Sequence, residues 1–193
     1  MDPAFDGDPD WRVTRELQDG SSCVIRPITP EDREGLDRAF HETSLQTRYL
    51  RFGLAASTLT QAALTYLTTV DQKDHVALVA TCTSPDLKTE RGIGVARFVR
   101  MADDPTAAEA AVTVVDEMQH KGVGHALTRE LGRAALARGI TKLRAEVLDA
   151  NTRMRVILER ASARPLTADA ADGTVVYELD LTRVDDDAAP RGR

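Results

Sequence analysis

The chain has 193 residues, 42% of them hydrophobic and 29% charged, which predicts one globular domain without room for a second of ordinary size. Its 25 Lys and Arg residues against 31 Asp and Glu give a net charge of −6, which argues against nucleic acid as a partner. No apolar run approaches the roughly 18 residues that span a bilayer, and the acidic first ten residues are unlike a signal peptide. We therefore expect a cytoplasmic protein with no membrane partner.

Both ends of the chain differ in composition from its centre. Residues 1–20 are rich in aspartate and in chain breakers, so we expect a flexible N-terminal arm that docks at most through Trp11 and Val13. Residues 184–193 are expected to form a flexible acidic tail. The predicted single folded domain is therefore 21–183.

Strand patterns alternate with helical patterns through this domain. Thr29, Pro30 and Asp32 are the residue types of a helix start, with Thr29 as the N-cap and Asp32 at the capping-box position. Turn residues separate three consecutive strand candidates, which predicts an antiparallel meander. In chain order, we expect strands at 23–26, 75–82, 92–100, 108–115, 142–148 and 174–181, and helices near 30–40, 58–67, 122–138 and 152–161.

The strongest chemical signal lies where the strand at 108–115 leads into the next helix. The intervening loop ends in Gln-His-Lys-Gly-Val-Gly, residues 119–124, and an amphipathic helix begins inside it. Glycines at a helix start leave backbone N–H groups exposed, and together with the helix dipole these groups suit a pyrophosphate. Lys121 could add positive charge at the rim of this site.

Two common phosphate-binding motifs are excluded at this loop. A P-loop requires Lys and Ser or Thr after the last glycine, but His125 follows Gly124. A dinucleotide fingerprint requires a third glycine or alanine where Leu127 stands. The cysteines and histidines show no metal-ligand spacing either, so no metal is expected.

The remaining pattern is Q-x-x-G-x-G after a strand, with an acidic residue on that strand and Asn151 after the next strand. This combination resembles the acetyl-coenzyme A binding core of the GNAT family of N-acyltransferases. The resemblance covers roughly residues 23–181 and is closest to the bacterial protein lysine acetyltransferase branch. The segments similar to that branch are 25–32, 47–52, 109–124, 146–148 and 151–154.

The resemblance implies an α+β fold with a mixed, mostly antiparallel sheet flanked by helices and splayed between the strands at 108–115 and 142–148. The pantetheine arm of acetyl-CoA would lie in the splay and pair with the backbone of Val112, Thr113 and Val114. Asn151 would contact the arm. The pyrophosphate would be held by the loop and helix start, which comprise Gln119, His120, Lys121, Gly122, Val123, Gly124 and, beside them, His125.

The implied reaction is the attack of a primary amine on the acetyl thioester. An amine arrives as an ammonium ion, so a base must remove a proton, and Glu109 is the candidate that matches the family. A solvated strand-end carboxylate is the alternative interpretation of Glu109. The backbone N–H of Val112 would stabilise the developing oxyanion. Arg48, Tyr49 and Phe52 lie where the family builds its acceptor wall, although core packing explains the Tyr and Phe equally well.

The sequence also departs from the family pattern. Leu158 stands where many GNAT enzymes place a tyrosine that protonates the leaving thiolate, Ser162-Ala163 replaces the usual Gly-Phe, and Met118 replaces an aromatic residue. A coenzyme A thiolate can leave with the help of water, so we still expect an enzyme, and the missing tyrosine favours a protein acceptor. The expectation is an acetyl-CoA-dependent lysine acetyltransferase, monomeric or homodimeric. The alternatives are an acetyltransferase for an aminoglycoside, polyamine or amino acid, and a noncatalytic acyl-CoA binding regulator.

Overall fold

The computed structural model describes residues 2–52, 58–83, 90–166 and 173–183, with only the backbone at 51 and 52, so the predicted tail at 184–193 lies outside it. Its centre is an eight-stranded sheet with the order β1-β2-β3-β4-β5-β6-β8-β7. The strands are β1 (Val13–Glu16), β2 (Ser22–Pro27), β3 (His75–Thr83), β4 (Glu90–Arg100), β5 (Ala107–Val114), β6 (Lys142–Leu148), β7 (Arg164–Pro165) and β8 (Thr174–Asp180). The α-helices are α1 (Arg33–His41), α2 (Leu45–Phe52), α3 (Gln61–Thr68), α4 (Val123–Leu136) and α5 (Thr152–Arg160).

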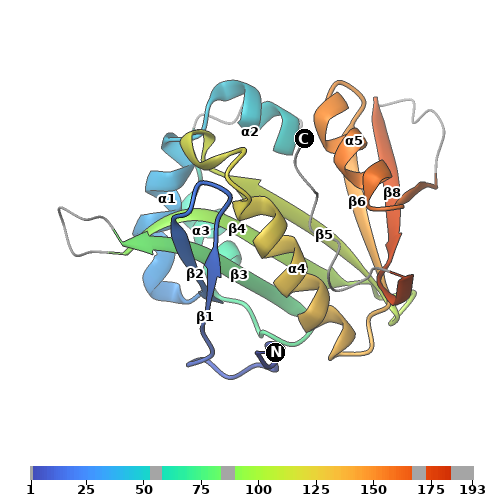
Figure 1. Cartoon of the computed structure of the whole chain (residues 1–193), viewed down its shortest axis with the longest axis horizontal. Helices are drawn as coiled ribbons and strands as arrows, with labels where there is room; N and C mark the ends of the chain where they lie inside the picture. Colours follow the sequence, from blue (N-terminus) through green and yellow to red (C-terminus); the bar gives the residue numbers. More distant parts are fainter. Residues whose placement is uncertain (1, 53–57, 84–89, 167–172, 184–193) are drawn as a thin grey trace.

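Helices cover both faces of this sheet (Figure 1). The apolar stripe of α4, which includes Leu127 and Leu131, is buried against one face together with Leu78 and Phe98 of β3 and β4. Alternate residues of β3 point to the opposite face, which α1 and α3 cover. A separate apolar cluster joins α5 to β6 and β8; its members include Val147, Tyr177, Met154 and Leu158.

The predicted α+β fold is confirmed, including the antiparallel meander of β3, β4 and β5. The predicted helix start before α1 also forms, although its first turn is a 3-10 turn at Pro30–Asp32. Thr29 is the N-cap of this turn, and Asp32 at the capping-box position accepts from the Thr29 backbone N–H through Oδ2 at 2.8 Å. The capping residues were read correctly because their interactions are local and need no tertiary partner.

The N-terminal segment differs from expectation, because it is packed on the domain rather than forming a flexible arm. Residues 13–16 form β1, which pairs antiparallel with β2. Leu17 N–H donates to Ser21 O at 2.7 Å and closes the turn between these strands. Phe5 is fully buried and Trp11 is 8% exposed. Burial of these two aromatic side chains explains why the segment docks despite its many aspartates.

The sheet opens at its single parallel step. Within the described residues, β5 and β6 pair only where Ala107–Glu109 lies beside Lys142–Arg144, and further along neither strand pairs with another strand on that side. Figure 1 shows the two strands diverging toward the end of the molecule where α4 and α5 begin. The predicted splay is therefore present between β5 and β6.

Candidate functional site

The backbone of β5 determines which polar groups face the splay. Val115, directly after the strand, donates its N–H to Ile93 O of β4 at 3.1 Å, and Ala107 O accepts from Met101 N–H at 3.0 Å. In an antiparallel ladder the N–H and C=O groups of alternate residues point to the same neighbour. The odd-numbered residues of β5 therefore turn their backbone groups toward β4, and the even-numbered residues turn theirs toward β6.

Val112 and Val114 consequently direct their backbone groups into the splay, where β6 has already moved away. An unpaired strand edge of this kind can hydrogen-bond an extended ligand as an added strand would. Thr113 differs from the expectation, because its backbone groups face β4. The Thr113 side chain instead lines a cavity on the opposite side of the sheet.

At the open end of the splay, the loop before α4 has several backbone N–H groups that make no hydrogen bond to the described residues. α4 has a glycine N-cap, Gly122, and no side chain caps its first turn. The first N–H groups of a helix lack partners within the helix, so those of Val123 and Gly124 are available to a ligand. His120 has φ 64° and Gly122 has φ 95°, and left-handed residues within such a loop can turn successive N–H groups toward one anion. This loop has the form of an anion site.

The side chains of this loop have separate roles in the structure. Gln119 donates from Nε2 to Val114 O at 3.2 Å and so ties the loop to the end of β5. Lys121 points away toward the turn between β1 and β2, where its Nζ lies 3.4 Å from Asp19 Oδ2. Desolvation of the ring and the nearby Arg129 lower the pKa of His125, which favours its neutral form. The backbone N–H groups, more than these side chains, are therefore placed to face an anion.

Asn151 lies across the splay from this loop, at the start of α5. Its Oδ1 accepts from Met154 N–H at 3.1 Å, which makes Asn151 the N-cap of the helix. Its side-chain NH₂ group can still donate to a ligand. The structure thus brings together the predicted residues of the loop, of β5 and of α5 around one opening.

Glu109 marks the closed end of the splay. It is the last residue of β5 that pairs with β6, and its partner position is Arg144. The guanidinium of Arg144 is already engaged by Glu178, with Nε 3.1 Å from Oε2. Glu109 is exposed, and within the described residues its carboxylate has no hydrogen-bond or ion-pair partner. A carboxylate with free lone pairs is able to accept a proton.

A cavity of about 300 Å³ opens on the face of the sheet opposite α4. Ala111 and Thr113 line it, and Glu109 shares their side of β5 because side chains alternate along a strand. The wall also holds an ion pair between Arg26 Nη2 and Asp32 Oδ1 at 2.7 Å. Burial favours a higher pKa for Asp32, but hydrogen bonds from Arg26 and from Thr29 N–H hold it below its usual value. Asp32 is therefore a neutralised carboxylate and a poor candidate for the base.

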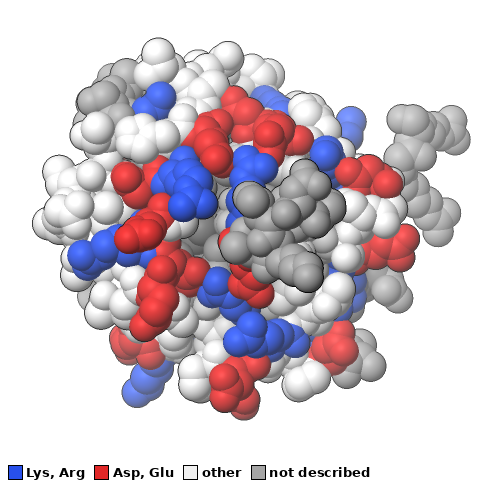
Figure 2. Space-filling model, turned by 90° about the vertical axis from the view of Figure 1, so that its left-hand side faces the viewer, with Lys and Arg blue, Asp and Glu red and all other residues white. Residues whose placement is uncertain are grey.

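The predicted acceptor wall is only partly found at this cavity. Arg48 lines it, and its guanidinium lies 5.0 Å from the centre of the Phe40 ring. Tyr49 is 47% exposed on α2 and is not among the lining residues. The side chain of Phe52 lies outside the described residues. Figure 2 shows acidic and basic side chains interspersed over the face that carries α1, so no single sign of charge dominates there.

Two contributors to this region were missed by sequence reasoning. From the sequence, Arg26 was only the end of a strand and Asp32 only a capping residue. Their ion pair in the cavity wall was not predicted, because it depends on how β2 and the 3-10 turn pack together. Arg153 contacts Gln119 and His120 from α5 across the splay. Its proximity to the loop depends on the fold, and the spacing of the two segments in the sequence gives no sign of it.

The parts of the chain that the structure describes carry no sign of a metal site or of a membrane span. Within those ranges, no group of three or more His, Cys, Asp or Glu side chains is placed to hold a metal ion. Across the same residues, every helix is too short or too polar to cross a bilayer.

Comparison with known sequences identifies related proteins. The family model described as "Acetyltransferase (GNAT) domain" matches residues 23–164. Acetyltransferase Pat of Mycolicibacterium smegmatis is 34% identical over 174 residues, which make up 88% of this chain and 49% of that protein. Acetyltransferase PA5475 of Pseudomonas aeruginosa is 30% identical over 152 residues, or 79% of this chain and 78% of that protein. The chain thus spans about half the length of Pat.

Solved structures of acetyltransferases and an acyltransferase are also similar to this chain. The GNAT domain of S. lividans PAT has a TM-score of 0.80 and 30% identity, and the match covers 88% of this chain and 97% of that one. The cAMP-binding acyltransferase from Mycobacterium smegmatis has a TM-score of 0.61 and 30% identity, covering 94% of this chain and 50% of that one. The putative acetyltransferase YncA from Salmonella typhimurium, solved with its cofactor acetyl-CoA, has a TM-score of 0.68, covers 90% of this chain and 100% of that one, and at 17% identity shows a likeness of fold alone.

Proposed function

Because the chain belongs to the GNAT acetyltransferase family, we propose that it transfers the acetyl group of acetyl-CoA to the ε-amino group of protein lysines, with Glu109 as the general base. The observation that carries this proposal is the geometry of β5. At one end of the strand lies a loop whose N–H groups suit an anion, and near the other lies a carboxylate without a partner among the described residues. The separation between Glu109 and Val114 is about 17 Å along an extended strand. An elongated ligand with phosphates at one end and a reactive acyl group at the other suits this arrangement.

Each group along β5 then has a role. The N–H groups at the start of α4 bind the pyrophosphate, and the backbone groups of Val112 and Val114 pair with the pantetheine arm. Glu109 removes a proton from the attacking ammonium, directly or through water, and frees the nitrogen lone pair. The N–H of Val112 donates to the oxyanion that forms at the acyl carbon. Collapse of this intermediate breaks the C–S bond and releases the coenzyme A thiolate; the nitrogen gives its second proton to solvent, and solvent protonates the thiolate.

Solvent is the proposed proton donor for the thiolate, because the position of the family's tyrosine is Leu158. Leu158 packs with Val147 and Tyr177 in the apolar cluster beneath α5. This position therefore supplies no proton to the sulfur.

The choice of a protein acceptor is supported by the resemblance to the lysine acetyltransferase branch and by the similarity to proteins named Pat. The acceptor would approach from the cavity side of β5, the side that Glu109 shares. The mixture of charges on the face that carries α1 does not by itself select an acceptor.

The test compares the wild type with Glu109→Gln. The variant keeps the shape of the side chain but cannot accept a proton, so we expect unchanged affinity for acetyl-CoA and a kcat about 10²- to 10⁴-fold lower near neutral pH. Acetylation of lysine peptides would be followed by mass spectrometry, and coenzyme binding by calorimetry.

Three other outcomes would reject parts of this proposal. Full activity of Glu109→Gln would remove Glu109 as the base. Efficient acetylation of polyamines or amino acids, with lysine peptides inert, would replace the protein acceptor with a small amine. Coenzyme binding by the wild type without turnover on any amine would indicate a noncatalytic acyl-CoA binding module.

A further inference from the structure

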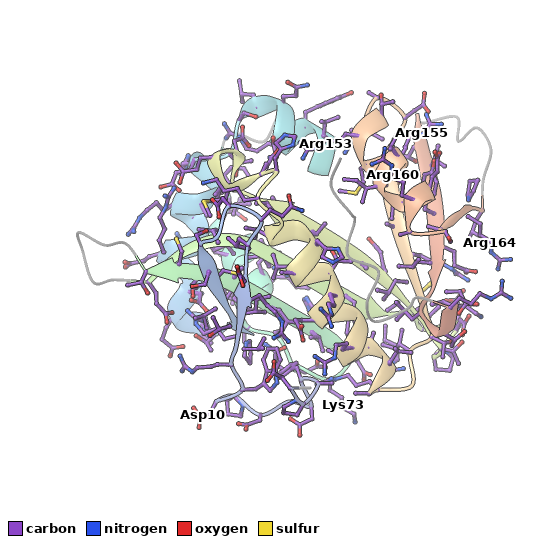
Figure 3. The ribbon with its side chains drawn as sticks, viewed as in Figure 1. Asp10, Lys73, Arg153, Arg155, Arg160 and Arg164 are labelled. Carbon is purple, nitrogen blue, oxygen red and sulfur yellow. The ribbon has the colours of Figure 1, made fainter. Side chains whose placement is uncertain are left out.

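Arg153 is in the first turn of α5, directly after the N-cap Asn151 and Thr152. In Figure 3 its side chain extends from the start of the helix toward the middle of the molecule, whereas Arg164 points outward. Because β6 leads into α5, this places a guanidinium at the open end of the splay. The loop at 119–124 before α4, called the anion loop below, lies on the other side of that opening.

The contacts of Arg153 cross the splay. Its Nη1 donates to Gln119 Oε1 at 3.2 Å, and its Nη2 lies 3.1 Å from His120 Nδ1. A guanidinium has no acceptor atom, so His120 Nδ1 must be the acceptor. Gln119 in turn is bonded to Val114 O at 3.2 Å. Arg153, Gln119 and Val114 thus form a continuous hydrogen-bonded connection from α5 to the end of β5.

The charge of Arg153 is not neutralised in this arrangement. Among the described residues, no carboxylate lies within ion-pair distance of it, whereas Arg155 on the same helix turn pairs with Asp149. The first turn of α5 also contains no acidic residue. A cation at a helix N-terminus opposes the helix dipole, so this position is locally unfavourable for Arg153. Residues that break a local rule of this kind are expected at functional sites.

We propose that Arg153 binds the phosphates of acetyl-CoA and gives up its contacts with Gln119 and His120 when the coenzyme enters. This proposal rests on the proposed function. The two contacts it would lose are hydrogen bonds to neutral groups. Those it would gain are charge-assisted hydrogen bonds to phosphate oxygens, which the guanidinium can make in pairs. Arg153 would then close the coenzyme site from the α5 side, opposite the N–H groups of the anion loop.

The test measures dissociation constants by calorimetry for the wild type, Arg153→Ala and Arg160→Ala. Arg160 ends the same helix, is exposed and makes no hydrogen bond or ion pair within the described residues, so its variant is a matched control for lost charge. We expect Arg153→Ala to weaken coenzyme A binding roughly 10- to 100-fold and Arg160→Ala to leave it nearly unchanged. The dissociation constant of Arg153→Lys should lie between those of the wild type and Arg153→Ala, because lysine keeps the charge but cannot make paired hydrogen bonds.

Two shorter ligands identify the phosphate concerned. Dephospho-coenzyme A lacks the 3′-phosphate, and S-acetylpantetheine lacks every phosphate. If Arg153 binds the pyrophosphate, Arg153→Ala weakens the binding of coenzyme A and of dephospho-coenzyme A equally. If it binds the 3′-phosphate, only coenzyme A is affected. Either result supports the proposal when S-acetylpantetheine binding stays the same.

Other results would overturn it. Unchanged coenzyme A affinity in Arg153→Ala, an equal loss in Arg160→Ala, or an equal loss for S-acetylpantetheine would each show that Arg153 does not bind phosphate. Failure of the folded wild type to bind coenzyme A would instead reject the proposed function, and with it this role. Thermal unfolding of each variant checks that the fold is intact.

Discussion

Carboxylates in this protein differ in whether a cation neutralises them. Glu130 on α4 is buried, and Arg15 and Arg133 lie 2.8 Å and 3.1 Å from its oxygens. Glu178 on β8 is 5% exposed and lies between Arg164 and Arg144. Glu109 has no such partner within the described residues, although it lies on the strand next to Arg144. The two buried carboxylates are thus paired, whereas the candidate base has no partner in the part of the chain that the structure describes.

The pairing of Glu178 predicts a dependence of stability on pH. The hydrogen bond from Arg164, 2.7 Å from Oε1, and a second from Arg144 hold the pKa of Glu178 below its usual value. A lowered pKa in the folded state means that the stabilisation is complete above about pH 4.3, the ordinary Glu pKa, and is lost as pH falls through the lowered value.

We expect Glu178→Gln to reduce the free energy of unfolding by about 2 kcal/mol at pH 7. The difference from wild type should stay constant down to about pH 5 and shrink below pH 4. Urea unfolding at a series of pH values measures it. A difference that grows in acid would show that the ion pairs do not stabilise the fold.

At the scale of elements, the N-terminal segment fixes α4 at several points along its length. Gln18 N–H donates to Lys121 O at 2.8 Å just before the helix. Arg15 of β1 reaches Glu130 near its middle, and Arg138 Nη1 donates to Phe5 O at 2.6 Å after its last turn. The helix whose N-terminus forms the anion loop is therefore held by residues that the composition alone assigned to a mobile arm.

Removal of Arg15 tests this attachment. Arg15→Ala leaves the buried Glu130 with Arg133 as its remaining partner, and loss of a partner from a buried ion pair costs about 3 to 5 kcal/mol. We expect Arg15→Ala to lower the free energy of unfolding in urea by about 3 kcal/mol, the lower end of this range, because Arg133 compensates in part. Arg183→Ala is the control: its pair with Asp180 is largely exposed, so it should change stability by at most about 1 kcal/mol. If Arg15→Ala and Arg183→Ala lower the free energy of unfolding by equally small amounts, β1 contributes little to holding α4.

Elements with strong local signals were the ones that the sequence predicted best. The strand at 142–148 has the predicted bounds, and the glycine-rich start and apolar stripe of α4 located that helix to within two residues. Two elements that were not predicted, β1 and α2, also have local sequence signals. Asp19-Gly20 is a common hairpin turn, and it joins β1 to β2. Ser44 caps α2 by accepting from Thr47 N–H at 3.2 Å.

The site was less predictable than the fold, because it depends on contacts between distant segments. Family resemblance located the loop at 119–124 and Asn151, which follow directly from local sequence. It assigned Thr113 the same backbone role as its neighbours, although strand alternation turns that residue toward β4. Arg153 was not identified, since only the packing of α5 brings it to the loop.

At the scale of the whole molecule, the proposed function requires that acetyl-CoA bind in the splay between β5 and β6, with its phosphates at the start of α4. Gly124 is the residue to change, because a Cβ there would meet Val114 Cγ2 at 3.6 Å, an ordinary contact. An aspartate in the first turn also favours the helix itself, so Gly124→Asp should fold while repelling phosphate. Gly124→Ala adds bulk without charge and is the matched control.

The most direct measurement is thermal unfolding of these three proteins with and without acetyl-CoA. At about 100 times its dissociation constant, the ligand should stabilise the wild type by about 2.7 kcal/mol, which raises Tm by roughly 5 to 10 °C for a domain of this size. A coenzyme site in the splay predicts this shift for the wild type, most of it for Gly124→Ala and none for Gly124→Asp. A folded wild type without a shift, or a Gly124→Asp variant that shifts as much as the wild type, would contradict it.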